Sequence, residues 1–260
     1  MKKGIIVSSF GTTYKETRDL CIGSIENLIK EEFEGDLVLR AFTSEIVRRI
    51  LKERDKLTID NVPSALERLK EKGISNIYIQ PLHIIAGIEY EKILRQVERF
   101  KERGENKDFS IKIGSPLLSG ESSYERVIEA LSLPEDKPGR GLVYMGHGSS
   151  HEADQSYENL ERAIRKKGFE NVFIGTIEGS KGIDCILKEL KEKQIRQVDL
   201  KPFLLVAGDH ANNDMASDDK DSWKSILERN NIEVTTELKG LGQVKEIQNI
   251  FLNKLRELYQ

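Results

Sequence analysis

The sequence contains few cysteines and no long apolar run. Only two cysteines occur in 260 residues, Cys21 and Cys185, and each lies within a predicted helix, so we expect both to be packed side chains. Two isolated cysteines form neither a disulfide framework nor a zinc motif, which argues against sulfur ligation of a metal. No segment approaches the roughly 20 apolar residues that a membrane-spanning helix needs. The opening apolar run, in MKKGIIVSSFG, is also too short for the core of a signal peptide.

The chain also has no large excess of positive or negative charge. The chain has 41 Lys and Arg against 44 Asp and Glu, a net charge of −3 at pH 7. This balance gives no argument for a nucleic-acid or membrane partner. With 38% hydrophobic and 33% charged residues, the composition is typical of a soluble globular protein, which we expect in the cytoplasm. The length suffices for one large domain or two ordinary ones.

The common phosphate-binding fingerprints are absent too. Neither a P-loop nor a G-x-G-x-x-G pattern occurs, so a sugar-phosphate or nucleotide enzyme is a remote alternative. Two turns that combine glycine with hydroxyl residues, FGTT at 10–13 and HGSS at 147–150, lead into helical patterns. Backbone amides at a helix start favour carboxylates and phosphates, and ordinary helix capping is the competing explanation.

Short apolar runs alternate with longer amphipathic stretches along the whole chain. Runs this short and rich in Val and Ile are typical of buried parallel strands, and their alternation with helices indicates an α/β fold. The predicted strands are at 4–10, 36–43, 76–84, 109–115, 141–146, 171–177, 197–206 and 232–238. The predicted helices are at 13–32, where Thr13 to Glu16 has the spacing of a capping box, and at 64–72, 89–102, 152–167, 183–193 and 244–259.

This alternation occurs twice. GIIVSSFGTT at 4–13 matches GLVYMGHGSS at 141–150, residues 66–89 match 187–210, and 39–45 match 173–179 more weakly. We therefore predict two similar tandem lobes, each a mainly four-stranded parallel sheet flanked by helices. Residues 1–134 form the first lobe, the Pro- and Gly-rich segment 135–140 is the linker, and 141–260 form the second lobe. Packing of the last helix back on the first lobe is left open.

The two halves differ where their matched strands end. The first half has Phe10, Ser44 and Glu89 at these positions, and the second has His147, Glu178 and His210. Ligands of parallel α/β sheets bind at the carboxyl ends of strands. Two imidazoles and a carboxylate suit Co²⁺, Ni²⁺, Fe²⁺ or Zn²⁺ and leave coordination positions open. The same groups could also accept protons, and each alone could be structural.

Other candidate residues have weaker patterns. We expect His83 to lie along a strand as a core or cleft-wall residue, and His151 to be a solvated helix start. The acidic stretch around Asp214 is interpreted as a solvated charge run. Positive charge in the first half could meet an acidic ligand or belong to ordinary helix surfaces; it comprises Lys15, Arg18, Arg48, Arg49 and Arg54.

Several blocks together resemble a known family. GLVYMGHGSSHEADQSY, GTIEG and PFLLVAGDHANNDM, with SSFGTTYKETR, RAFTSEIVRRIL and QPLHIIAGIEYEK, are similar to the anaerobic cobaltochelatases of cobalamin biosynthesis, and the resemblance covers essentially the whole chain. It implies the class II chelatase fold, with a tetrapyrrole in a cleft between the lobes. The implied reaction inserts Co²⁺ into sirohydrochlorin, or its reduced precursor precorrin-2, and releases two protons. Some members of the family are exported, whereas this sequence shows no signal peptide.

The resemblance also implies the metal set, which is His147, Glu178 and His210, with Glu178 as adjacent ligand or base. His147 is expected to accept a pyrrole proton, since imidazole titrates near neutrality. The repeat suggests that Glu89, opposite His210, would relay protons or steer the ion, and that Phe10, which matches His147, would offer an apolar face to the macrocycle. The expected substrate-binding set is completed by Ser9, Gly11, Thr12, Thr13, Thr43, Ser44 and Arg48.

The implied partners are small molecules only. They are a tetrapyrrole and a divalent ion, with no nucleic acid and no membrane, while homo-oligomer formation is left open. No cofactor is expected beyond the substrate metal, and Fe²⁺, Ni²⁺ or Zn²⁺ suit the same ligands as Co²⁺. The alternatives are a sirohydrochlorin chelatase for Fe²⁺ or Ni²⁺, and a bilobal protein that binds a metal or tetrapyrrole without catalysis.

Overall fold

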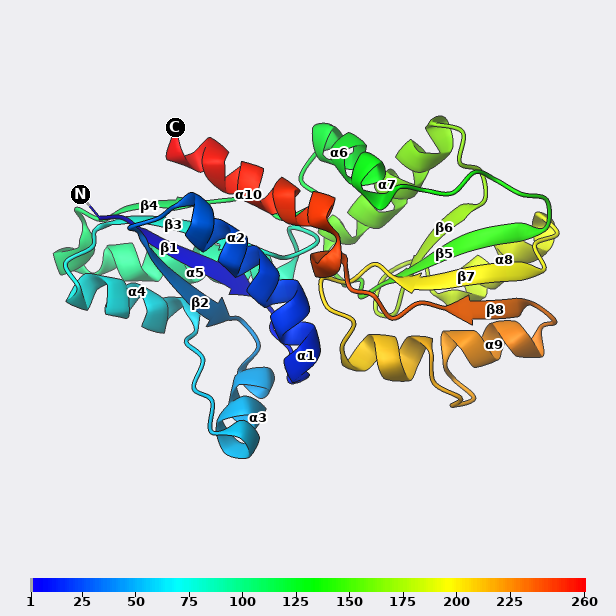
Figure 1. The fold of residues 1–260 in the computed structure, drawn as a ribbon, viewed down its shortest axis with the longest axis horizontal. Helices are drawn as coiled ribbons and strands as arrows, with labels where there is room; N and C mark the ends of the chain where they lie inside the picture. Colours follow the sequence, from blue (N-terminus) through cyan, green and yellow to red (C-terminus); the bar gives the residue numbers. More distant parts are fainter. Residues whose placement is uncertain (1) are drawn as a thin grey trace. The chain divides into compact units, whose positions relative to one another are not determined.

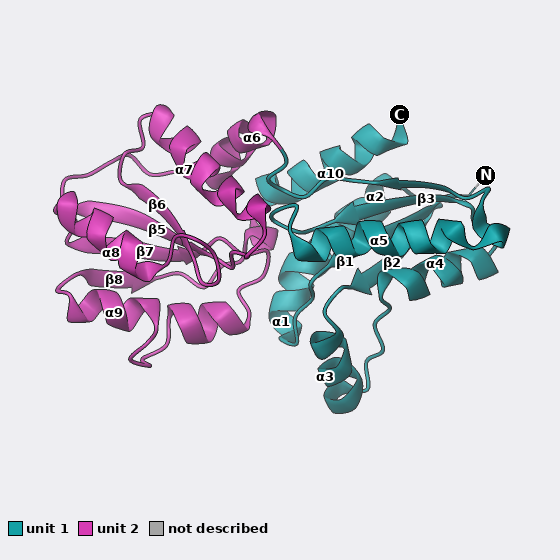
Figure 2. Cartoon of the chain, turned by 180° about the vertical axis from the view of Figure 1, so that it is seen from behind, with its two compact units in different colours: residues 1–119, 245–260 teal, residues 120–244 magenta. Residues whose placement is uncertain are grey.

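The computed structural model describes residues 2–260, which divide into two compact units (Figures 1 and 2). Unit 1 contains the chain up to Ser119 together with Lys245–Gln260, and unit 2 is Gly120–Val244. The division precedes α6 (Glu121–Leu131), whereas the sequence prediction places it at 135–140. The reason for the difference is that α6 packs against α7 (Gln155–Lys166), a helix of unit 2.

Each unit contains one parallel four-stranded sheet, as predicted. The order is β2-β1-β3-β4 in unit 1 and β6-β5-β7-β8 in unit 2, so the repeat extends to the topology. Each strand falls largely within a predicted apolar run. The strands are β1 (Gly4–Ser9), β2 (Leu37–Phe42), β3 (Asn76–Pro81), β4 (Ser110–Ile113), β5 (Arg140–Gly146), β6 (Val172–Thr176), β7 (Gln197–Pro202) and β8 (Glu233–Thr236).

The helices include several that the apolar pattern did not indicate, namely α3, α6 and α9. In unit 1 they are α1 (Lys15–Thr17), α2 (Ser24–Glu32), α3 (Glu45–Asp55), α4 (Val62–Glu71), α5 (Ile88–Glu102) and α10 (Lys245–Tyr259). Unit 2 adds α8 (Ile183–Glu192) and α9 (Trp223–Arg229) to α6 and α7. None of the helices within residues 2–260 has the length and apolar character needed to cross a membrane.

The first predicted helix begins differently from the expectation. A capping box at Thr13 is not formed, because α1 starts after Tyr14 without a side-chain cap. The Thr12 hydroxyl instead accepts a hydrogen bond from the Tyr14 amide. A π-helical segment, Arg18–Gly23, separates α1 from α2. The predicted helix at 13–32 is therefore three consecutive helical segments.

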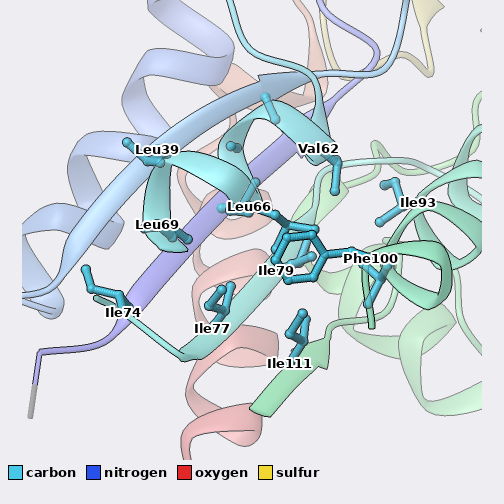
Figure 3. Packing of buried hydrophobic residues seen from close by; sticks show 14 residues of the cluster. Leu39, Val62, Leu66, Leu69, Ile74, Ile77, Ile79, Ile93, Phe100 and Ile111 are labelled. Atoms are coloured by element: carbon cyan, nitrogen blue, oxygen red, sulfur yellow. The ribbon is translucent and has the colours of Figure 1, made fainter. Parts of the chain in front are cut away.

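The core of unit 1 lies between its sheet and helices α4 and α5 (Figure 3). Ile77 and Ile79 of β3 point into this core because alternate residues of a strand face the same side. Tyr78, on the opposite face, stacks on Tyr259 of α10 with ring centroids 4.0 Å apart. Both faces of the sheet are thus covered, as parallel sheets require.

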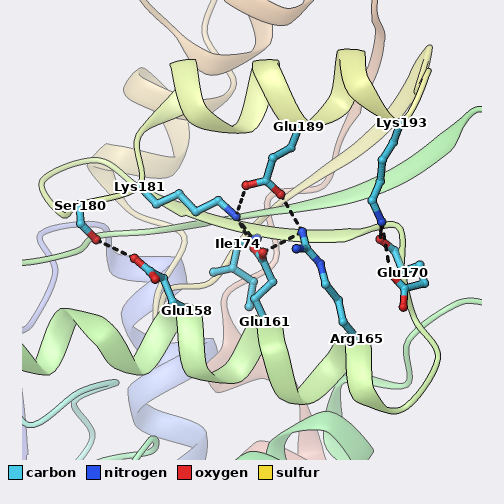
Figure 4. A network of polar contacts seen from close by, with 9 residues as sticks. All are labelled: Glu158, Glu161, Arg165, Glu170, Ile174, Ser180, Lys181, Glu189 and Lys193. Atoms are coloured by element: carbon cyan, nitrogen blue, oxygen red, sulfur yellow. Dashed lines mark hydrogen bonds and ion pairs between the residues drawn. The ribbon is translucent and has the colours of Figure 1, made fainter.

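In unit 2, β6 and helices α7 and α8 are joined by a buried ion network (Figure 4). Glu161 of α7 is 6% exposed and accepts hydrogen bonds from the Lys181 ammonium at 2.8 Å and from the Ile174 amide at 2.5 Å. Arg165 lies 2.8 Å from the same carboxylate. Glu189 of α8 pairs with both cations, at 2.6 and 2.7 Å. The network fixes Lys181 at the end of the loop that follows β6.

Replacement of Glu161 by Ala should be strongly destabilising, since it leaves the Ile174 amide unpaired and two partly buried cations with one anion. We expect the free energy of unfolding to fall by about 3 kcal/mol or more, measured by urea denaturation. The matched control is Glu170→Ala, because Glu170 is 62% exposed and pairs with Lys193 at 3.3 Å. An exposed pair contributes at most about 1 kcal/mol. Equal losses in the two variants would contradict this interpretation of the network.

Candidate functional site

The topology of unit 2 brings two of the predicted metal ligands together. β6 lies on one side of β5, and β7 and β8 lie on the other. The connection that leaves β5 and the connection that leaves β7 therefore run in opposite directions. Such a switch point at the carboxyl edge is where open α/β sheets bind ligands. His147 directly follows β5, and His210 lies in the segment after β7. Their imidazole rings meet edge to face with centroids 4.7 Å apart.

The His147 ring is oriented by its own turn. Nδ1 lies 3.0 Å from the carbonyl oxygen of Gly148, which can only accept, so this contact holds a proton on Nδ1. The lone pair of Nε2 is then available to a metal ion. Gly148 has φ +79°, and a Cβ there would collide with the Gly179 amide and the Thr176 side chain. The turn therefore requires glycine.

Glu178 lies on the neighbouring loop, after β6. Its amide donates to the His147 carbonyl at 2.8 Å, so the two backbones are directly paired. The Glu178 Oε2 atom lies 3.8 Å from His147 Nδ1. The side chain is 60% exposed. Glu178 is thus next to the imidazole pair, with freedom to reorient.

His210 has a carboxylate partner that the sequence analysis did not assign. Its Nδ1 donates to Asp214 Oδ2 at 2.8 Å, one turn further along the chain. A carboxylate behind an imidazole orients a metal-binding histidine and raises its basicity. The i,i+4 spacing of His210 and Asp214 was the available signal, but the surrounding acidic residues obscured it. The side chain of His210 is 38% exposed, as is that of His147.

Within residues 2–260, no three side chains of His, Cys, Asp or Glu are already arranged to hold one metal ion. Two imidazoles face each other, and Glu178 points its carboxylate toward the protonated Nδ1 of His147. A rotation of the exposed Glu178 side chain is needed to complete three donors. The arrangement supports a loosely held ion with open positions, in contrast to a closed structural site.

The equivalent edge of unit 1 presents an aromatic ring in place of an imidazole. Phe10, which corresponds to His147, is 47% exposed. Gly11 has φ +94°, and a Cβ there would lie 2.5 Å from the Phe42 ring. Five of the six large exposed hydrophobic residues in the described chain belong to unit 1, on segments after β1, β2 and β3. These five are Phe10, Tyr14, Leu20, Ile46 and Ile88.

Among the Ser and Thr residues of unit 1 that were predicted to bind substrate, some have hydrogen-bond partners within the protein and one has none. The Ser44 hydroxyl accepts from the Val47 amide and caps α3. The Thr43 hydroxyl lies 3.5 Å from His83 Nε2, and Thr13 offers its carbonyl to Arg54. The Ser9 hydroxyl is buried without a hydrogen-bond partner.

Glu89 and His83 lie near the carboxyl end of β3. Glu89 is in the first turn of α5 and is 32% exposed, with Oε2 buried and not hydrogen-bonded and Lys92 3.9 Å away. Lys92 donates to the Thr43 carbonyl at 2.7 Å, a contact that the sequence did not indicate. His83 lies two residues beyond β3, so its predicted place along the strand is wrong, and its Nδ1 is buried without a partner.

Two of the predicted positive side chains of unit 1, Arg48 and Arg18, have structural partners. Arg48 donates to the Ile59 carbonyl at 3.0 Å. Arg18 is only 4% exposed and donates to the Thr12 carbonyl. His151 of unit 2, expected at a helix start, caps the short 3₁₀ helix Glu152–Asp154 by accepting from the Ala153 amide.

His83 should remain neutral at physiological pH. Burial lowers its pKa from 6.5 to about 4. Between these values the unfolded chain binds more protons than the folded one, so this residue makes stability fall as pH falls from about 6.5 to 4. We expect the imidazole resonances of His83 in NMR titrations to stay those of the neutral ring at pH 5.5. Titration of this ring near pH 6.5 would contradict the prediction.

Comparisons with known proteins place the whole chain among relatives. The family model described as "Cobalt chelatase (CbiK)" matches residues 3–260. The sirohydrochlorin cobaltochelatase of Salmonella typhimurium is 37% identical over 259 residues, covering 99% of this chain and 96% of the relative. The sirohydrochlorin cobaltochelatase CbiKC of Nitratidesulfovibrio vulgaris is also 37% identical, over 98% of this chain and 89% of its own length.

Solved structures of chelatases share the fold at low identity. SirB from Bacillus subtilis with Fe³⁺ superposes with a TM-score of 0.65 at 17% identity, covering 99% of this chain and 95% of SirB. CbiX, the terminal enzyme of siroheme biosynthesis in denitrifying bacteria, superposes with a TM-score of 0.55 at 14% identity, over 98% and 99% of the two chains. Together with the near full-length family match, these findings show that the chain belongs to the cobalt chelatase (CbiK) family.

Proposed function

We propose that this chain is a sirohydrochlorin cobaltochelatase that inserts Co²⁺ into sirohydrochlorin, or into precorrin-2, in anaerobic cobalamin biosynthesis. The observation that carries the proposal is the paired imidazoles of His147 and His210 at the switch point of a unit 2 sheet. Family membership supports the same reaction, since two relatives with that name align with the chain over nearly its whole length.

In this proposal the substrate metal binds to the Nε2 atoms of the two histidines. Their Nδ1 atoms are engaged with the Gly148 carbonyl and the Asp214 carboxylate, which leaves Nε2 of each ring as the donor. Glu178 supplies the third donor after its exposed side chain turns. Three protein ligands leave positions for water and for the incoming pyrrole nitrogens. The ion can then pass to the macrocycle without first losing every ligand.

Insertion releases two pyrrole protons, and a base must accept them. A single lone pair on His147 Nε2 cannot hold the ion and a proton together, so His147 accepts a proton only as the ion leaves it. The Glu178 carboxylate has spare acceptor positions and can take the other proton. Glu89 of unit 1, whose Oε2 atom is buried without a hydrogen bond, is a further proton or ion relay in this scheme.

Unit 1 is proposed to bind the tetrapyrrole. Its exposed apolar side chains after β1, β2 and β3, Phe10 among them, offer a surface suited to a flat macrocycle. The unpartnered Ser9 hydroxyl and the segment Gly11–Thr13 are suited to the acetate and propionate groups of sirohydrochlorin. Thr43, Ser44 and Arg48 have protein partners, so each would have to exchange one to bind substrate.

Ligand replacement tests the metal set. His147→Ala and His210→Ala should each lower the rate of cobalt insertion by about 100-fold or more, because each removes a donor whose outer partners alone are worth 10- to 100-fold. Binding of sirohydrochlorin, followed by its fluorescence, should stay close to wild type. The control is His151→Ala, a nearby histidine that caps a 3₁₀ helix. Full activity of either ligand variant would rule out the site.

Turnover distinguishes the competing functions. Purified protein mixed with sirohydrochlorin and Co²⁺, Fe²⁺ or Ni²⁺ should yield the cobalt complex fastest, followed by absorbance, with many turnovers per protein. A faster reaction with Fe²⁺ or Ni²⁺ would favour a chelatase for that metal, since affinity order alone does not select cobalt. One equivalent bound without turnover would favour a binding protein. The cytoplasmic location stays a prediction that cell fractionation would test. The oligomeric state is left open, and light scattering would measure it.

A further inference from the structure

The two loops that carry His147 and Glu178 are joined by one buried carboxylate. Asp154, between the HGSS turn and α7, is 6% exposed. Its Oδ1 accepts from the Ser149 amide at 3.1 Å, and its Oδ2 accepts from the Ser180 amide at 2.8 Å. Ser149 stands two residues after His147, and Ser180 stands two residues after Glu178. The carboxylate thus fixes equivalent points of both loops.

Other contacts make this junction rigid. The Ser180 hydroxyl lies 2.9 Å from Asp154 Oδ2 and 3.1 Å from Glu158 Oε1, so its one proton is shared between two carboxylates; the contact with Glu158 is drawn in Figure 4. A Cβ on Gly179 would collide with both carboxylate oxygens of Asp154. The loop can therefore approach the carboxylate only because that residue is glycine.

Asp154 is poorly suited to bind the ion itself. Each of its oxygens accepts a backbone amide, the Ser180 hydroxyl lies 2.9 Å from Oδ2, and the side chain is buried. We propose that Asp154 is a positioning residue. Together with the Glu178 amide, which donates to the His147 carbonyl, it fixes the backbone positions from which the His147 and Glu178 side chains reach the substrate metal, and so determines the affinity for that metal. His210 approaches from the segment after β7 and is not held by this carboxylate. This inference rests on the proposed metal set.

The chain provides a matched control. Asp136 also accepts two backbone amides, one on each oxygen, from Glu170 at 2.6 Å and Asn171 at 3.1 Å. It lies before β5, and both of its partners lie just before β6, so it is at the opposite edge of the same sheet. Asp154→Asn and Asp136→Asn therefore remove the same charge from carboxylates that each accept two amides, one buried and one exposed, at opposite edges.

The experiment measures Co²⁺ binding to each full-length variant by calorimetry without tetrapyrrole, and then the KM for Co²⁺ and the kcat of insertion. Asp154→Asn should weaken Co²⁺ binding and raise the KM by about 10-fold or more. Its affinity for sirohydrochlorin should be unchanged. Asp136→Asn, which changes an exposed carboxylate, should lower thermal stability less and leave Co²⁺ binding at the wild-type value. Equal Co²⁺ affinity in the two variants would overturn the proposal.

A second pair of variants separates positioning from charge. Asp154→Glu keeps the charge and displaces the carboxylate by one methylene, so positioning predicts weakened Co²⁺ binding here as well. Wild-type affinity in Asp154→Glu would show that charge alone mattered and would overturn the proposal. If Asp154→Asn does not fold, Ser180→Ala removes the hydroxyl donor to Asp154 and should weaken Co²⁺ binding more mildly. Unchanged Co²⁺ binding in Ser180→Ala would contradict the proposal. Retained binding in His147→Ala would instead refute the metal set itself.

Discussion

The site depends on one constraint, the pairing order of each parallel sheet. The first strand of each unit lies inside its sheet, with the second strand on one side and the third on the other. Connections from the first and third strands therefore leave the same edge in opposite directions and open a gap at that edge. In unit 2 this brings His147 and His210 into ring contact although 63 residues separate them.

Identical scaffolds carry different chemistry in the two units. After the first strand, unit 1 has a half-exposed phenyl ring and unit 2 has an imidazole whose Nδ1 proton is held by a neighbouring carbonyl. After the third strand, unit 1 has Glu89 in the first turn of a regular helix, whereas His210 precedes a π-helical turn that brings Asp214 behind it. The two units share their strand order, and they differ in the side chains at the strand ends, which we propose serve the macrocycle in unit 1 and the metal in unit 2.

The strands were readable from the sequence because both faces of a parallel sheet must be apolar. Helix α3 was not predicted, although Ile46, Val47, Ile50 and Leu51 recur at helical spacing, and only Leu51 of its eleven residues is buried. Helix α6 does carry a stripe, Tyr124, Val127 and Ile128, that could have been recognised. The histidines and Glu178 were recognised by comparing the repeats. Asp154 gave no such signal, because its partners are backbone amides, which every residue possesses.

Because α10 belongs to unit 1, the two units can complete their folds in a fixed order during synthesis. Unit 2 is one continuous segment, Gly120–Val244, whereas unit 1 needs Lys245–Gln260 as well as the chain up to Ser119. On the ribosome, every residue of unit 2 emerges before the helix that covers one face of the unit 1 sheet through Tyr78 and Tyr259. The half proposed to present the metal can thus complete its fold first, and the half proposed to bind the macrocycle completes its fold last. In topological terms, unit 2 is an insertion into unit 1.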